Sequence, residues 1–175
     1  MISLPLGFLA ATNVSPPWIS HPIKLFLGFV RSIPLIVVAI LFVVAVGLGP
    51  FPGMLAIAFH SVGMLGKFYA EEFETAEEGI LNAVQGTGAT WIQTLRFGHF
   101  PQCVPQVLAF TVYRFEMNFR DAAVLGLVGA GGIGFYIQTY ARGFYYDRVA
   151  VLLLVIILVV TILDQFTFLV RKWVR

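Results

Sequence analysis

A largely apolar run over residues 149–170 is the feature that most constrains how this chain can fold. A helix needs about 20 apolar residues to cross the hydrocarbon core of a bilayer, and this run is long enough. Residues 25–48, 51–68 and 104–119 form similar segments, and a shorter one at 122–137 is rich in glycine. Because the chain is 59% hydrophobic and only 11% charged, it is not an ordinary soluble domain. We predict an all-α membrane protein with about four to five transmembrane helices.

The charged C-terminal residues orient these predicted spans. Arg171, Lys172 and Arg175 surround Trp173 directly after the last apolar run. Basic residues concentrate on the cytoplasmic side of membrane proteins, and tryptophan favours the interface. The C-terminus is therefore predicted to be cytoplasmic. Counting the spans backward then places the polar stretch at residues 71–100 in the cytoplasm as well.

The N-terminal residues 1–12 do not fit a complete structural element. They lack the positively charged start of a signal peptide, and they are too short to cross a bilayer. We interpret them as the remnant of a span, within a single transmembrane domain that covers residues 1–175.

Several classes of function find no support in the sequence. The net charge is only +2 and the basic residues are scattered, so nucleic acid is not an expected partner. Cys103 is the only cysteine and is expected to be a small buried hydrophobic residue. No phosphate-binding loop, metal-binding cluster or nucleophile motif occurs. We therefore expect neither enzymatic activity nor a cofactor in this chain.

The cytoplasmic stretch begins with a capping-box pattern. Thr75 and Glu78 have the Thr-x-x-Glu spacing that starts a helix, here at Ala76. Gly86 and Gly88 are suitable C-terminal stops. The pattern therefore predicts a short first helix in this stretch.

A second capping box follows at Thr90 and Gln93. Gly98 and Pro101 are expected to end the second helix after about two turns. Apolar residues at helical spacing lie on both helices, namely Ile80, Leu81, Val84, Trp91, Ile92 and Leu95. They either pack against the protein's own spans or form a docking surface for a partner, and the length of the loop favours docking.

This loop resembles the motif E-A-A-x-x-x-G-x9-I-x-L-P of permease subunits in ABC importers. Ala83, Gly88 and Pro101 stand at the spacing of that motif, whereas Asn82 replaces its glutamate. The segments VGLGPFPGMLAIAFHSVGMLGKFYAE, TGATWIQTLRFGHFPQ and YRFEMNFRDAAVLGLVGAGGIG resemble permeases of the phosphonate importer family over most of the chain. Those permeases usually begin with a further span, so the chain is expected to be truncated at its N-terminus.

The resemblance implies a type I ABC importer permease-like bundle in a bacterial inner membrane. Its expected partners are a cytoplasmic ATP-binding subunit, an extracytoplasmic solute-binding protein, a second copy of the chain and the lipid bilayer. ATP would be bound by the partner subunit. By the same resemblance the two short helices are coupling helices, and the residues expected to couple to the ATPase are Asn82, Ala83, Gly88, Trp91, Ile92, Leu95 and Pro101.

A glycine cluster follows the fourth apolar segment. Gly129, Gly131 and Gly134 satisfy the dinucleotide-binding pattern G-x-G-x-x-G, but the required second strand with its terminal acidic residue is missing, since Asp147 precedes a membrane span. In a membrane, glycines allow helices to pack closely or to break at a cavity. The cluster, which includes Gly132, is therefore interpreted as a pathway wall or gate, with simple helix packing as the alternative.

Charged residues precede the glycines. Glu116 and Arg120 are four residues apart and are expected to pair on one helix face. Arg114 is expected to lie deep in the bilayer without a local anionic partner. Its guanidinium suits a phosphorus oxyanion, so it either faces the transport pathway or pairs with a carboxylate on another span. His60 is expected to be a packing residue.

The sequence predicts an ATP-driven importer permease for phosphonate or a related phosphorus oxyanion. The alternatives are a permease for another small solute, an ion-coupled channel or secondary transporter that uses Arg114 and Glu116 as a relay, and a membrane scaffold that transports nothing.

Overall fold

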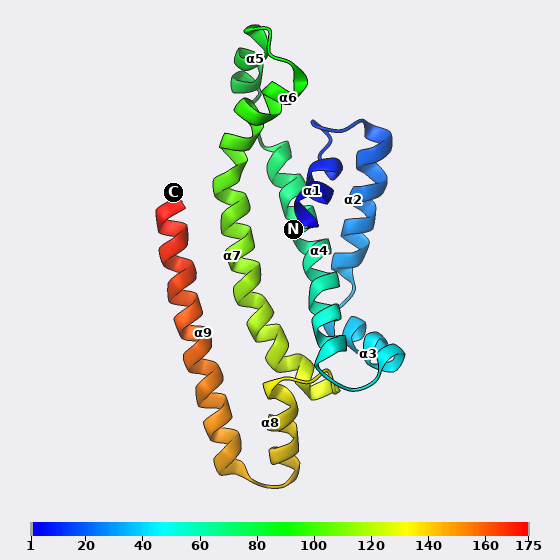
Figure 1. Ribbon diagram of the computed structural model, residues 1–175, viewed down its shortest axis with the longest axis vertical. Coiled ribbons are helices and arrows are strands. Elements are labelled where there is room, and N and C mark those ends of the chain that lie inside the picture. Colours follow the sequence, from blue (N-terminus) through cyan, green and yellow to red (C-terminus); the bar gives the residue numbers. More distant parts are fainter. Residues whose placement is uncertain (1, 175) are drawn as a thin grey trace.

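A computed structural model describes residues 2–174, and every regular element in this range is helical (Figure 1). The prediction of an all-α protein is therefore confirmed. Arg175 and the side chains of Arg171 and Trp173, on which the predicted orientation partly rests, lie outside the described residues. The elements are α1 (Ser3–Ala10), α2 (Pro17–Ser32), α3 (Leu35–Val46), α4 (Pro50–Glu74), α5 (Glu78–Gly86), α6 (Trp91–Thr94), the π-helix η1 (Leu95–His99), α7 (Phe100–Leu125), the 3-10 helix η2 (Gly126–Val128), α8 (Ile133–Arg142) and α9 (Tyr146–Val174).

The long helices run along the long axis of the molecule. α2, α4, α7 and α9 extend in this direction, with α5 and α6 beyond one end and α3 and α8 near the other (Figure 1). The C-terminal part of α9 points toward the end that carries α5 and α6.

Only one described helix is both long and apolar enough to cross a membrane by itself, residues Tyr146–Leu169 of α9. Two bent combinations also qualify if each is taken as one span, Pro17–Ser32 with Leu35–Val46 and Trp91–Val128 with Ile133–Arg142, which gives up to three spans. α4 does not qualify under this test of length and composition, although it lies alongside the other long helices (Figure 1).

The expected continuous span at residues 25–48 is wrong in detail. α2 and α3 are bent by 86° with respect to each other. The bend lies at Ile33, which is extended, and at Pro34, which caps α3. Proline lacks an amide hydrogen and disfavours helical backbone at the residue before it, so the helix ends there.

The tight turn between α3 and α4 is present. Gly47 and Gly49 adopt φ values of 99° and 147°, which side chains other than glycine rarely tolerate. The amide of Gly49 donates to the carbonyl of Gly129 at 3.1 Å. The turn is thereby fastened to the glycine cluster that follows α7.

The first predicted capping box is wrong. The hydroxyl of Thr75 donates backward to the carbonyl of Glu72 at 2.8 Å, and Thr75 caps the end of α4. Helix α5 consequently begins at Glu78 rather than Ala76, although it ends at Gly86 as expected.

The second capping box is confirmed, because the amide of Thr90 donates to Oε1 of Gln93 at 2.7 Å. The predicted end of this helix at Gly98 and Pro101 is wrong. α6 continues through the π-helix η1 directly into α7, and Pro101 lies in the first turn of α7.

An apolar core lies beneath the α5–α6 end of the molecule. It joins the α1–α2 loop, α4, α5, η1 and α7, and Phe8 of α1 packs against it. Its buried members are Ala11, Val14, Tyr69, Phe73, Ala76, Leu81, Leu95, Cys103 and Val107. Burial of Cys103 agrees with its expected role as a small hydrophobic residue.

Candidate functional site

The segment of α5, α6 and η1, called the α5–α6 loop, presents an apolar surface at the end of the molecule. Trp91 is 59% exposed, Ile92 is 70% exposed and Phe97 is 63% exposed. Asn82 and Ala83 on α5 are also exposed. Apolar patches of this kind, when exposed to water, usually mark a site of interaction.

Two apolar residues of the loop pack inward, whereas Ile80 is exposed. Leu81 and Leu95 are buried in the apolar core, so Leu95 does not lie on the exposed surface as predicted. The packing alternative therefore applies to Leu81 and Leu95, and docking stays a prediction for the exposed residues. Phe97 was missed by the sequence reasoning because it belongs to the π-helix, which a simple 3.6-residue period does not anticipate.

Backbone geometry and one side chain fix the loop. Gly88 adopts a φ of 80°, a left-handed conformation that favours glycine at the reversal between α5 and α6. Gln102, another residue missed in the sequence, accepts the amide of Glu77 at 2.8 Å and donates to the carbonyl of Gly98 at 2.9 Å. The start of α5 is thus bound to the first turn of α7, and Pro101 is exposed beside it.

A buried polar cluster joins the middle of α4 to α7. Arg114 is only 2% exposed, and its Nε donates to the Ser61 hydroxyl at 3.0 Å while Nη2 lies 3.1 Å from Nδ1 of His60. Nη2 also lies 3.4 Å from Oδ2 of Asp121. Ser61 donates onward to Asn118 at 3.1 Å.

The expectation that Arg114 has no local anionic partner is wrong. Its carboxylate partner, Asp121, lies on the same helix, so pairing with another span is not the explanation either. His60 was expected to be a packing residue whose polar atoms are satisfied, and its contact with Arg114 agrees with this expectation. The whole cluster clamps α4 to α7 through charge-assisted hydrogen bonds.

The predicted pair of Glu116 and Arg120 is confirmed. Glu116 is buried, whereas the side chain of Arg120 is 53% exposed. Arg120 therefore offers an accessible guanidinium one turn from the buried cluster, whereas the guanidinium of Arg114 is occupied by protein groups.

The glycine cluster forms close backbone contacts. A β-carbon at Gly134 would overlap the carbonyl oxygen of Ala123 and lie 3.0 Å from the α-carbon of Gly126. A β-carbon at Gly131 would lie 2.6 Å from the nitrogen of Pro50. These contacts correspond to the packing alternative for this cluster, and they join η2 and α8 to the ends of α7 and α4.

The other glycines of the cluster shape the backbone. Gly129 and Gly132 adopt φ values of 82° and 77°, and Gly132 caps the start of α8. The helical path is therefore broken between α7 and α8. A non-helical segment inside a membrane protein must be surrounded by protein, and the close contacts of the glycines provide this packing.

Comparison with known proteins gives a consistent result. Residues 3–175 match the model of the family described as binding-protein-dependent transport system inner membrane component. The phosphite transport system permease protein PtxC of Stutzerimonas stutzeri is 43% identical over 98% of this chain and 63% of its own length. The phosphate-import permease protein PhnE of Mycolicibacterium smegmatis is 40% identical over 97% of this chain and 32% of its own length.

Solved structures share the fold. An inward-facing structure of the MetNI methionine ABC transporter superposes with a TM-score of 0.84 at 19% identity, over 99% of this chain and 86% of that chain. The expected permease-like helical bundle is thereby confirmed. The chain spans less than two thirds of the length of the two named permeases.

Proposed function

The chain belongs to the family of binding-protein-dependent transport system inner membrane components, and from this premise we propose that it is the transmembrane permease subunit of an ATP-driven importer for a phosphorus oxyanion such as phosphite or phosphonate. The observation that carries the proposal is the 43% identity to a phosphite permease over 98% of the chain. Likeness over this extent includes both the α5–α6 loop and the polar cluster of α4 and α7.

The energy for transport would come from a separate cytoplasmic subunit that binds and hydrolyses ATP. Trp91 and Ile92, with the newly identified Phe97, form the surface that docks to this subunit. Asn82, Ala83, Gly88 and Pro101 shape or flank that surface. Closure of the ATPase would displace the loop, and the continuous path from α6 through η1 into α7 would carry the displacement to the spans.

The pathway is proposed to run beside the charged part of α7. Arg120 is exposed and can attract an oxyanion, and Glu116 holds it in place. Arg114 can exchange the carboxylate of Asp121 for a substrate oxyanion in another conformation, since a guanidinium binds both groups by the same paired hydrogen bonds. Movement near Gly129, Gly131, Gly132 and Gly134 is proposed to open and close this path.

A solute-binding protein on the outer side and a second copy of the chain complete the proposed assembly, which resides in the bacterial inner membrane. The cluster of the buried Arg114 with the half-buried His60 and Asp121 also suits an ion-coupled transporter, because ionisable groups within a membrane protein often form a relay. This second candidate would be driven by an ion gradient rather than by ATP hydrolysis.

The substrate can be tested in bacterial cells that lack their own phosphite and phosphonate uptake. The protein is expressed with its ATPase and binding protein, and uptake of labelled phosphite is measured in the presence of competitors. We expect excess phosphite or methylphosphonate, but not methionine, to suppress uptake. Equal suppression by methionine, or uptake no greater than in cells without the protein, would contradict the proposed substrate class.

The same cells test the docking surface. Trp91→Ala should abolish uptake, because it removes an exposed aromatic residue of the docking loop, whereas Phe29→Ala provides a matched control. Phe29 is 67% exposed but lies on α2, away from the loop. Equal uptake by the two variants at equal membrane abundance would argue against the proposed docking surface.

A further inference from the structure

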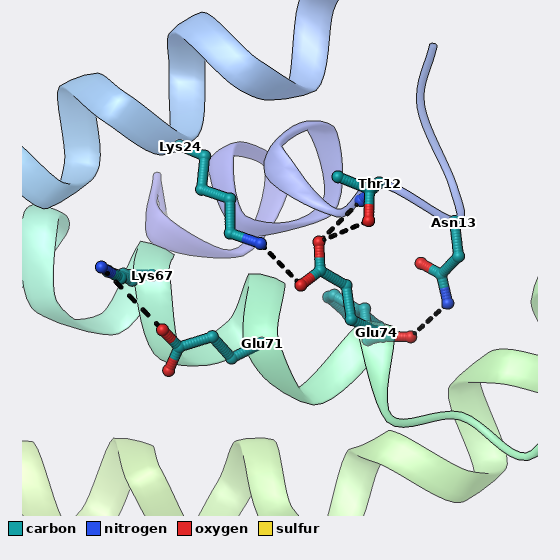
Figure 2. A network of polar contacts seen from close by, with 7 residues as sticks. Thr12, Asn13, Lys24, Lys67, Glu71 and Glu74 are labelled. Carbon is teal, nitrogen blue, oxygen red and sulfur yellow. Dashed lines mark hydrogen bonds and ion pairs between the residues drawn. The ribbon is translucent and has the colours of Figure 1, made fainter. Parts of the chain in front are cut away.

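A polar network surrounds Glu74, the last residue of α4 (Figure 2). Its Oε1 accepts the amide and the hydroxyl of Thr12 at 2.9 and 2.8 Å. Its Oε2 accepts Nζ of Lys24 at 2.7 Å. The amide group of Asn13 also donates to the carbonyl of Phe73 at 2.7 Å. Four polar contacts thus bind α2 and the α1–α2 loop to the last turn of α4.

The network is placed where the α5–α6 loop begins. α4 ends at Glu74, Thr75 caps it, and α5 starts at Glu78. Phe73, next to Glu74, is buried in the same apolar core as Leu81 of α5. A displacement of the loop therefore reaches the end of α4 through the chain and through the core.

Besides the guanidinium of Arg31 over the Phe68 ring, close apolar contacts join α2 to the body of α4. Gly66 packs against Leu27, and Gly63 packs against Val30. Such contacts hold helices together, but dispersion and burial have little directional preference. The hydrogen bonds of Glu74 are directional and charge-assisted, so they fix the position of α1 and α2 along α4.

The carboxylate of Glu74 is held in its charged form. Burial raises its pKa, but the hydrogen bond from Lys24 and the two from Thr12 outweigh burial and lower the pKa overall. The ion pair is accordingly intact at neutral pH.

We propose that Glu74 is a positioning residue that makes α1 and α2 move together with the α5–α6 loop during transport. The inference rests on the proposed function, since it assigns a path by which loop displacement reaches α2. α1 also touches the loop directly, because the rings of Phe8 and Trp91 lie 6.3 Å apart, so for α1 the Glu74 network is a second path. Loss of the Glu74 contacts would loosen the coupling of the loop to α1 and α2, so that ATP is hydrolysed with less transport.

The chain provides a matched control one turn earlier on α4. Nζ of Lys67 lies 4.0 Å from Oε1 of Glu71, within the same helix (Figure 2). This pair joins no two elements. Glu71→Gln is therefore the same chemical change as Glu74→Gln at a position that cannot transmit movement between helices.

The test uses the complete complex in proteoliposomes and measures phosphite uptake and ATP hydrolysis in parallel. For Glu74→Gln we expect uptake per ATP hydrolysed to fall by about two- to thirtyfold, the range of coupling by residues outside ligand sites. Lys24→Met, which removes only the ion-pair arm, should give a smaller fall, and Glu71→Gln should match the wild type.

Several results would overturn the proposal. If uptake per ATP hydrolysed is unchanged in Glu74→Gln, even with a lowered melting temperature, the network has only a structural role. A fall of equal size in Glu71→Gln would make the effect one of surface charge. If Glu74→Gln does not fold, an unchanged ratio in Lys24→Met decides against the proposal. Absence of ATP-dependent uptake by the wild type would instead refute the proposed function.

Discussion

Replacement of Arg114 by methionine tests the buried cluster between α4 and α7. The change keeps an unbranched, flexible side chain but removes the donors to Ser61 and His60 and the cation beside Asp121. Removing one partner of a buried ion pair costs about 3–5 kcal/mol. Because the side chain of Asp121 is 26% exposed, we expect the lower end of this range, about 3 kcal/mol in the free energy of unfolding.

The assay is equilibrium unfolding in mixed micelles, with two further variants. Asp121→Asn in the Arg114→Met background removes the stranded carboxylate and should restore about 1–2 kcal/mol. Arg31→Met is the matched control, since Arg31 is exposed and its guanidinium lies over the Phe68 ring, 4.9 Å from the centroid. It should cost no more than about 1 kcal/mol.

The reasoning about this cluster would be refuted by either of two results. Arg114→Met could unfold within about 0.5 kcal/mol of the wild type, which is the range of ordinary surface substitutions. Alternatively, Asp121→Asn could give no restoration in the Arg114→Met background, which would show that the two residues are not coupled.

Two further predictions concern other parts of the chain. Gly134→Ala should lower stability by about 1–3 kcal/mol or prevent folding, because the added β-carbon meets the backbone of Ala123. Gly28→Ala has room for its β-carbon and should fold normally in the same melting assay. Equal melting temperatures for the two variants would contradict the close packing at Gly134. The lowered pKa of Glu74 stabilises the fold fully above the unfolded value of about 4.3, and this stabilisation is lost as the pH falls through the folded value. The melting-temperature difference between wild type and Glu74→Gln should therefore shrink in acid, and a difference that is constant from neutral to acidic pH would exclude Glu74 as its source.

Much of the fold follows from local sequence rules. The apolar composition of residues 149–170 predicts α9, and the glycines at 47 and 49 predict the turn before α4. The pair of Glu116 and Arg120 follows from the four-residue spacing of side chains on a helix. In each case one element, or one turn of it, contains the whole signal.

The errors arise where several elements decide the outcome. Asp121 reaches Arg114 from two turns away along α7, beyond the spacing that defines neighbouring side chains. The Arg114 side chain is held there by Ser61 and His60 on the facing surface of α4. Thr75 fits a helix start and a helix end equally well, since its hydroxyl can bond forward or backward. The register of α4 against α7, and the end of α4 at Glu74, are properties of packing that no local pattern contains.

The energy source of transport tests the central claim most directly. The complete complex is reconstituted into proteoliposomes with binding protein outside, and labelled phosphite uptake is measured with ATP inside, with a non-hydrolysable ATP analogue inside, or with an imposed proton or sodium gradient alone. We predict accumulation only with hydrolysable ATP, and its loss in Trp91→Ala. Accumulation driven by an ion gradient without ATP would contradict the account and identify an ion-coupled transporter.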